Sequence, residues 1–157
     1  KNIFYLKKNV KSLFRKYAEL IFEPFIGGQE IQVAVLNGSP LGAIELKPKR
    51  EFYDYKAKYS KSANTAHIMP ANLKKSKYLE AMQIATKAHN ALRCKGITRS
   101  DFKFFENKFY LLEINTQPGM TSLSLVPEIA KFRGIPFETL VIKILLNAGL
   151  NRWKSHY

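Results

Sequence analysis

The sequence is short of cysteine and has no long apolar run, and each shortage excludes a class of protein. Cys94 is the single cysteine among 157 residues, so the chain cannot form an internal disulfide. Disulfide-stapled secreted proteins are thereby excluded, and a reducing compartment is indicated. No apolar stretch approaches the ~20 residues that cross a bilayer, and no signal peptide is visible. We expect a cytoplasmic protein without a membrane partner.

Acidic residues are also scarce. Twelve Asp and Glu stand against 26 Lys and Arg, which gives a net charge of +14. Such an excess attracts anionic partners, nucleotides and nucleic acids among them. Nucleic-acid-binding domains concentrate basic residues on one patch with interleaved aromatics, whereas the lysines here are spread along the chain. We expect no dedicated nucleic-acid binding, and a non-catalytic basic module that binds nucleic acid or a partner protein is the alternative.

The apolar pattern predicts one main domain, because a chain of this length with 46% hydrophobic residues can bury one core. The best helix covers residues 73–93, where Leu79, Met82, Ala85 and Leu92 recur at helical spacing and His89 is assigned to the surface. The order of the elements, strands then a helix then strands then helices, indicates an α+β fold with a mainly antiparallel sheet. The other expected segments are helices at 9–18, 122–132 and 136–148, strands at 20–25, 30–36 and 41–46, a glycine hinge at 27–28, a turn at 37–40 and an irregular stretch at 47–71.

A predicted hairpin carries the most informative polar residues. The strand-like runs 102–105 and 109–114 are joined by Glu106, Asn107 and Lys108, which we interpret as a three-residue loop. Residue 101 then pairs with 113, and residue 99 with 115. Because side chains alternate along a strand, four polar side chains point to one face. They are Arg99, Asp101, Glu113 and Asn115.

The charges on this face predict a chemistry. Two opposed carboxylates repel each other unless a cation lies between them or one is protonated. Oxygen ligands with no His or Cys nearby suit Mg²⁺, which is usually completed by water and substrate phosphates. Arg99 could meet a phosphoryl group or an oxyanion, and the turn at Pro118 and Gly119 leads into a helix start that favours anions. The alternative is a solvated hairpin edge with a salt bridge.

These residues also carry a family resemblance. The motifs are Gly96-x-x-Arg99-x-Asp101, Glu113-x-Asn115-x-x-Pro118-Gly119-Met120-Thr121, Ser124-Leu125-Val126-Pro127 and Phe52-Tyr53-Asp54-Tyr55-x-Ala57-Lys58-Tyr59. With these motifs the chain resembles D-alanine–D-alanine ligases of the ATP-grasp superfamily from about Leu20 to about Gly149. Glu-x-Asn alone is common to many ATP-grasp enzymes, but its combination with the other motifs is specific.

The resemblance implies an ATP-grasp C-terminal catalytic domain over residues 27–150. Residues 1–26 would be a remnant of the central ATP-grasp domain with its hinge, and 151–157 a tail. The family's enzymes are roughly twice this length, so N-terminal and central domains are expected as missing partners. The resemblance implies ligation of two D-alanines with ATP through D-alanyl phosphate, for peptidoglycan precursors, by a homodimer. We expect no turnover from this chain alone.

The resemblance also assigns roles to residues. It implies that two Mg²⁺ (or Mn²⁺) ions are held by Asp101, Glu113 and Asn115. Arg99 and the Gly119 N–H would stabilise the tetrahedral intermediate and contact substrate. Glu23, Phe25, Ile26, Glu30 and Lys58 would bind the nucleotide. The loop that contains Lys58 and Tyr59 would close over the phosphates as a lid, and these two residues would hold it closed.

The residues at the start of the predicted helix at 122–132 have two interpretations. The resemblance implies that Ser124 and Leu125 hold the carboxylate of the second D-alanine, whereas from the sequence alone Ser122 and Ser124 are as well explained as helix caps. The acceptor is a second open point. Another ATP-grasp carboxylate–amine ligase with a different acceptor is the close alternative, although Tyr59 accompanies dipeptide rather than depsipeptide synthesis in this family.

Overall fold

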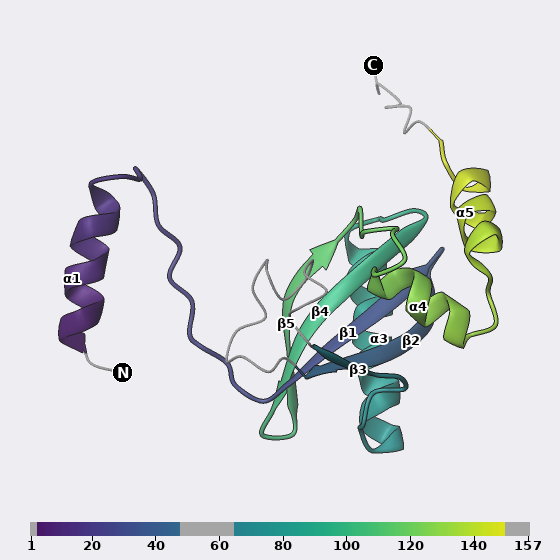
Figure 1. The fold of residues 1–157 in the computed structure, drawn as a ribbon, viewed down its shortest axis with the longest axis horizontal. Helices are drawn as coiled ribbons and strands as arrows, with labels where there is room; N and C mark the ends of the chain where they lie inside the picture. Colours follow the sequence, from purple (N-terminus) through teal and green to yellow (C-terminus); the bar gives the residue numbers. More distant parts are fainter. Residues whose placement is uncertain (1–2, 48–64, 150–157) are drawn as a thin grey trace.

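The computed structural model describes residues 3–47 and 65–149, which form one antiparallel sheet with helices on both faces (Figure 1). The sheet has five strands in the order β3-β2-β1-β4-β5, and every neighbouring pair is antiparallel. The predicted α+β class is confirmed. The strands are β1 (Gln29–Leu36), β2 (Ser39–Lys47), β3 (Ala66–Ile68), β4 (Ile97–Phe105) and β5 (Lys108–Asn115).

Strands β1 and β2 confirm the first predicted hairpin, with a shorter connection than expected. Leu36 pairs directly with Ser39, so only Asn37 and Gly38 form the turn. Both turn residues have positive φ, 50° and 77°. A two-residue turn of this kind matches the right-handed twist of the flanking strands, which is why Asn-Gly is favoured in it.

Helix α3 (Lys75–Ala91) confirms the longest predicted helix and packs on one face of the sheet. Its buried residues are Ala81, Ala85 and His89, whereas Leu79 is 47% exposed. The predicted apolar face is therefore wrong in part, because the small alanines let the helix approach β1 closely. The surface position predicted for His89 is also wrong, since this residue is 1% exposed.

Helices α4 (Leu125–Phe132) and α5 (Phe137–Leu146) confirm the last two predicted helices. Val126, Ile129 and Leu140 pack with Ala34 and Ile44 on the sheet face opposite α3. Helix α4 crosses β1 and β2 (Figure 1), so the apolar part of this face lies there. The β4 and β5 part of the same face carries polar residues instead.

The N-terminal residues are arranged differently from the rest. Helix α1 (Ile3–Phe14) has no buried residue and lies apart from the sheet (Figure 1). The strand predicted at 20–25 is wrong. Those residues form no strand, and Ile21 and Phe25 are 89% and 65% exposed. An apolar run becomes a strand only when a neighbouring strand takes its backbone hydrogen bonds, and the described sheet pairs β1 with β2 and β4.

Two further expectations were an irregular stretch at 47–71 and the absence of a membrane-spanning segment. The stretch 47–71 is not wholly irregular, because β3 within it pairs with β2. Residues 48–64 lie outside the description. Across the ranges 3–47 and 65–149, no helix has the length and apolar character needed to cross a membrane.

Candidate active site

The hairpin of β4 and β5 positions the predicted cluster by a different route from the one expected. Phe105 pairs with Lys108, so the loop has two residues rather than three, and the expected loop length is wrong. Glu106 and Asn107 both have positive φ, 47° and 63°. A bulge beside Asp101 then adds one residue to β5, which restores the expected register.

The bulge decides which side chains meet. Phe102 pairs with Leu111, whereas the next pair along the ladder is Asp101 with Glu113. Leu112 is the extra residue. In a regular ladder without the bulge, Leu112 itself would lie opposite Asp101. Arg99 pairs with Asn115 two residues further on. The predicted pairings are therefore confirmed, and all four polar residues lie on one face.

Arg99 connects the two carboxylates of this cluster. Its Nε donates to Oδ1 of Asp101 at 2.7 Å, and its Nη2 donates to Oδ2 at 2.9 Å. Nη2 also lies 4.0 Å from Oε1 of Glu113. The side chains of Arg99 and Asp101 are only 11% and 7% exposed, whereas that of Glu113 is 55% exposed. A two-pronged contact of this geometry is strong and directional.

The electrostatics of the cluster favour a cation. Burial raises the pKa of Asp101, and the nearby Glu113 carboxylate raises it further, whereas hydrogen bonding and charge attraction from Arg99 oppose the rise. Among the described residues, one guanidinium thus faces two carboxylates, and a cation bound beside them would reduce the repulsion between the two.

The donor set fits a magnesium ion that binds together with phosphate. Two carboxylates and the amide of Asn115 offer oxygen ligands only, which suits Mg²⁺. Among the residues that the structure describes, no group of three or more His, Cys, Asp and Glu could hold a metal by itself. An ion at this face would therefore take its remaining ligands from water and phosphate.

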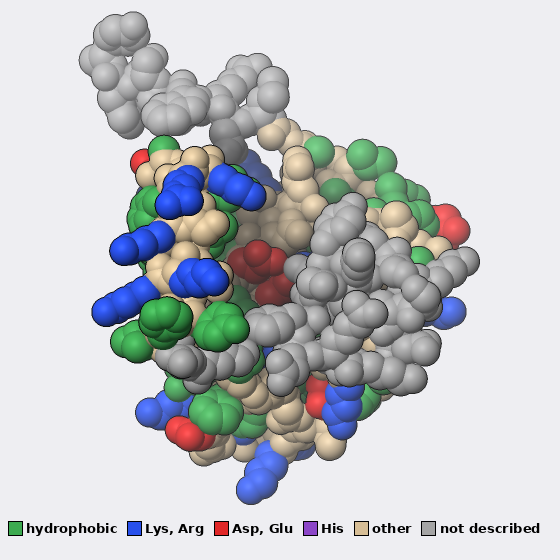
Figure 2. Space-filling model, turned by 60° about the vertical axis from the view of Figure 1, so that its left-hand side comes forward, with side chains coloured by type: hydrophobic (Ala, Val, Ile, Leu, Met, Phe, Trp, Pro, Cys, Tyr) green, Lys and Arg blue, Asp and Glu red, His purple; other side chains and the backbone are tan. Residues whose placement is uncertain are grey.

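Strand β1 adds polar side chains to the same face. Glu30 pairs with Lys103 and Gln32 with Asp101. Nζ of Lys103 donates to Oε2 of Glu30 at 2.9 Å, and the two side chains are 19% and 12% exposed. Figure 2 shows acidic side chains set back near the centre of the view, with lysine and arginine side chains to their left.

Sequence reasoning placed Glu30 at the site but missed Lys103 and Gln32. Both residues continue an alternation that was available in the sequence. Lys103 follows Asp101 by two positions, and Gln32 follows Glu30 by two. Residues two apart on a strand share a face.

The loop after β5 is compact around Ser124. Oδ1 of Asn115 accepts a hydrogen bond from the Gln117 N–H at 3.0 Å. Oγ of Ser124 accepts from the Thr121 N–H at 3.0 Å and lies 2.9 Å from the Thr121 hydroxyl oxygen. A Cβ at position 119 would lie 2.7 Å from the same Ser124 Oγ, so glycine allows the loop to approach.

Ser124 stands at the N-cap position of α4 but makes no side-chain capping hydrogen bond to the helix. The helix-cap interpretation is thus right about its position and wrong about its hydrogen bonding. Ser122 lies earlier in the loop, outside the cap position. Leu125 is the first residue of α4, and the N–H groups of a first turn point outward, where they bind anions.

The predicted nucleotide residues fall on two segments. Glu30 belongs to β1 and faces the cluster. Glu23, Phe25 and Ile26 lie in the segment between α1 and β1, where Glu23 and Phe25 are exposed. Lys58 and Tyr59 lie outside the described residues. Their predicted roles, like those of the cluster, stay predictions.

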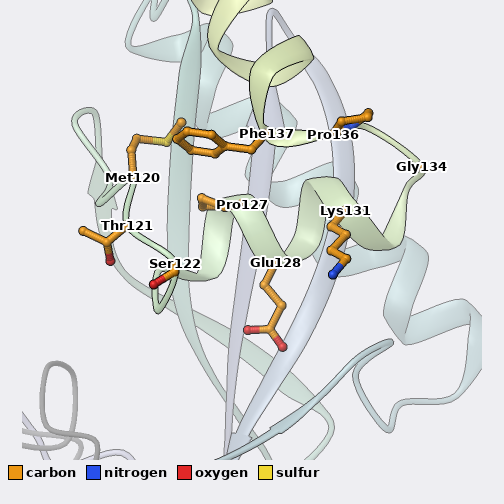
Figure 3. Close-up of a pocket in the computed structure, with 9 residues that line it drawn as sticks. All are labelled: Met120, Thr121, Ser122, Pro127, Glu128, Lys131, Gly134, Pro136 and Phe137. Atoms are coloured by element: carbon orange, nitrogen blue, oxygen red, sulfur yellow. The ribbon is translucent and has the colours of Figure 1, made fainter.

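A cavity of about 790 Å³ lies beside the loop, between it, α4 and the start of α5 (Figure 3). Met120 and Phe137 point toward each other across it. Glu128 on its wall lies 2.7 Å from Nδ1 of His67. None of the predicted site residues lines it, and its nearest link to the site is the contact of Thr121 with Ser124. The lining residues are Met120, Thr121, Ser122, Pro127, Glu128, Lys131, Gly134, Pro136 and Phe137.

Comparison with known proteins gives a consistent result. The family described as "D-ala D-ala ligase C-terminus" matches residues 1–146. The chain is 59% identical over 145 residues to a D-alanine–D-alanine ligase of Pelagibacter ubique, covering 92% of this chain and 47% of that protein. It is 51% identical over 138 residues to the ligase of Citrifermentans bemidjiense, covering 87% and 45%.

Solved structures agree with these sequence matches. The ligase of Bacillus anthracis complexed with ATP superposes with a TM-score of 0.77 at 25% identity, covering 93% of this chain and 46% of that chain. The ligase of Coxiella burnetii gives 0.73 at 30% identity, covering 94% and 39%. The chain therefore spans about half the length of the curated relatives it matches.

Proposed function

Because this chain belongs to the D-alanine–D-alanine ligase family, whose C-terminal part it matches, we propose that it forms the phosphate- and acceptor-binding half of such an enzyme. The complete enzyme would join two D-alanines with ATP, through a D-alanyl phosphate intermediate. We place the reaction in peptidoglycan precursor synthesis in the cytoplasm, in a homodimer whose N-terminal and central domains supply the other half.

In the proposed first step, a carboxylate oxygen of D-alanine attacks the γ-phosphorus of ATP and ADP leaves. Catalysis of such a step is positioning plus neutralisation of charge. Asp101, Glu113 and Asn115 would hold two Mg²⁺ (or Mn²⁺) ions, which when bound neutralise phosphate charge. Glu30 would accept hydrogen bonds from the ribose hydroxyls, and Lys58 with Tyr59 would close over the phosphates.

The adenine would lie against the segment before β1. Glu23 would accept from the adenine amino group, and Phe25 with Ile26 would contact its ring. The 65% exposure of Phe25 supports this proposal, because exposed aromatic surface can stack on the ring of a base.

In the proposed second step, the amino nitrogen of the other D-alanine attacks the acyl carbon and phosphate leaves. Arg99 and the Gly119 N–H would donate to the oxygen that becomes negative, which is the logic of an oxyanion hole. Ser124 and the Leu125 N–H would hold the acceptor carboxylate. The bonds between Ser124 and Thr121 support this, because they fix the hydroxyl next to the start of α4.

A single observation carries the proposal. Arg99 lies between the Asp101 and Glu113 carboxylates at paired positions of one hairpin. A solvated salt bridge would not bury both Arg99 and Asp101 or raise the pKa of that aspartate. The arrangement supports a site built for phosphate, metal and a developing oxyanion.

The test substitutes Glu113→Gln in the full-length enzyme that contains this chain. Its side chain is 55% exposed, so folding should survive, while Mg²⁺-dependent dipeptide formation should fall at least about a hundredfold. Ligation is measured as labelled D-alanyl-D-alanine by mass spectrometry, and folding by circular dichroism. Unchanged turnover would refute the assignment of Glu113 to the metal.

The acceptor is tested separately. The full-length enzyme is assayed with D-alanine, D-serine and D-lactate in turn as the second substrate. We expect D-alanine to be preferred. A preference for another acceptor would assign the chain to a different carboxylate–amine ligase with the same first step.

A further inference from the structure

Gln32 is the one fully buried glutamine of β1 and is not part of the site as proposed above. Its side chain is 0% exposed, and neither Nε2 nor Oε1 has a hydrogen-bond partner among the described residues. A carboxamide can donate two hydrogen bonds and accept two. Buried polar groups in native proteins are nearly always partnered, so an exception among the described residues calls for an explanation, and a bound ligand is one.

The strand alternation shows where this carboxamide points. Ile31 and Val33 pack toward α3, whereas Ala34 and Leu36 pack toward α4. Gln32 therefore faces the α4 side, which is the face that carries the Arg99 cluster. In the ladder it lies directly opposite Asp101 on one side and Ile44 on the other.

The polar neighbours of Gln32 on this face are already engaged. Both carboxylate oxygens of Asp101 accept hydrogen bonds from Arg99. Glu30, two residues earlier on β1, accepts from Lys103. Ile44 offers no polar side-chain atom. The carboxamide thus lies directly beside the charged cluster, and the described residues use neither its Nε2 nor its Oε1.

We propose that Gln32 is a positioning residue for the metal–nucleotide complex. Its Nε2 donates to a phosphate oxygen, and its Oε1 accepts from a metal-bound water. The side chains that cover Gln32 must move for these contacts to form. Arg99 must likewise move when an ion binds Asp101, because both carboxylate oxygens accept hydrogen bonds from it. The inference rests on the proposed function, since it requires magnesium and phosphate at this face.

The experiment uses the full-length enzyme with Gln32→Met and a matched control, Ser100→Ala. Oγ of Ser100 is also buried without a partner, but Ser100 pairs with Val33 and faces α3. The dissociation constant of ATP is measured by calorimetry with and without Mg²⁺, and melting temperatures are measured without ligand.

We expect Q32M to raise the dissociation constant of ATP about tenfold in the presence of Mg²⁺, when both contacts are lost, and only about threefold without Mg²⁺, when the phosphate contact alone is lost. The ligand-free melting temperature should not fall, because an apolar side chain of similar shape removes unpaired polar atoms. S100A should bind ATP as the wild type does under both conditions.

Other outcomes overturn the inference in distinguishable ways. If Q32M and the wild type bind ATP equally with Mg²⁺, Gln32 does not position the complex, and the proposed function stands. If Q32M melts lower and weakens binding equally with and without Mg²⁺, its role is structural. If the wild type itself binds no ATP, the proposed function and this inference both fail.

Discussion

The two faces of β4 each bury a polar pair, and comparing the pairs distinguishes a structural contact from a candidate functional one. On the α3 side, Nδ1 of His89 lies 2.8 Å from Oγ1 of Thr98. On the other side, the next residue, Arg99, donates to Asp101 at 2.7 Å. Both contacts are short and largely buried. Adjacent residues of one strand therefore place two polar pairs on opposite faces.

The pairs differ in charge balance. Burial lowers the pKa of His89, which keeps the imidazole neutral, so this pair needs no counter-ion. The Arg99 pair is charged, and Glu113 adds a second carboxylate beside it. A buried polar contact by itself therefore says little about function. Two carboxylates beside one guanidinium, with the pKa of one of them raised by burial, mark a candidate functional site.

The largest expected effect breaks the charged pair. Arg99→Met leaves the buried Asp101 carboxylate without its partner, which should lower the free energy of unfolding by about 3 kcal/mol. Ligation by the full-length enzyme should fall by orders of magnitude, because the donor for the oxyanion is lost. Urea unfolding and dipeptide formation are the measurements.

A double substitution separates the two losses in that variant. Arg99→Met with Asp101→Asn removes both charges, so most of the lost stability should return while ligation stays low. If ligation returned together with stability, neither Arg99 nor the Asp101 carboxylate would act in the chemistry, and the charged pair would be structural like the neutral one.

A smaller effect is expected at Lys103, which follows Asp101 by two residues on the face of β4 that carries Arg99. Lys103→Met removes the partner of Glu30, which should cost about 1 kcal/mol of stability and raise the KM for ATP a few-fold. Lys103→Arg keeps the charge and should behave as the wild type does. Steady-state kinetics with varied ATP gives the measurement, and an unchanged KM in K103M would remove Glu30 from the nucleotide site.

The smallest effect on chemistry is expected on the α3 side. His89→Gln should leave ligation unchanged and lower the free energy of unfolding by about 1 kcal/mol near neutral pH. Since the pKa of His89 is lower in the folded than in the unfolded state, its stabilising contribution is complete above the unfolded value of about 6.5 and is lost as the pH falls below it.

The pH dependence of that contribution has its own check. The stability gap between wild type and H89Q, measured by urea unfolding, should narrow between about pH 7.5 and about pH 5.5. A gap that stays constant over this range would mean that His89 does not change protonation between the two states. A loss of ligation in H89Q would show that the two faces of β4 are not independent.

The hairpin shows how a prediction can be right for a partly wrong reason. The expected three-residue loop has two residues, and the bulge at Leu112 supplies the missing step. The shared face of Glu113 and Asn115 could be predicted from the sequence, because a strand with one buried face strongly specifies its register. The bulge could not be predicted, since one extra residue in a strand does not change the composition in a recognisable way.

The errors at residues 20–25 and on α3 have a common cause. Ile21 and Phe25 have the composition of a strand, but a strand also needs a neighbour, which local sequence does not supply. On α3 the large residues were assigned to the core, whereas the close approach of the sheet selects Ala81 and Ala85. Contact distance between elements is a tertiary property, and propensity does not contain it.

The sequence by itself determined the family, the α+β class, the order of most elements and the four polar residues of the hairpin, because motifs and periodicity are local. Only the tertiary structure decided that Lys103 pairs with Glu30, that His89 is buried and that Gln32 lies unpartnered opposite Asp101. Those facts depend on which strands become neighbours and which helix covers which face. Residues distant in the chain acquire a shared environment only when the sheet assembles.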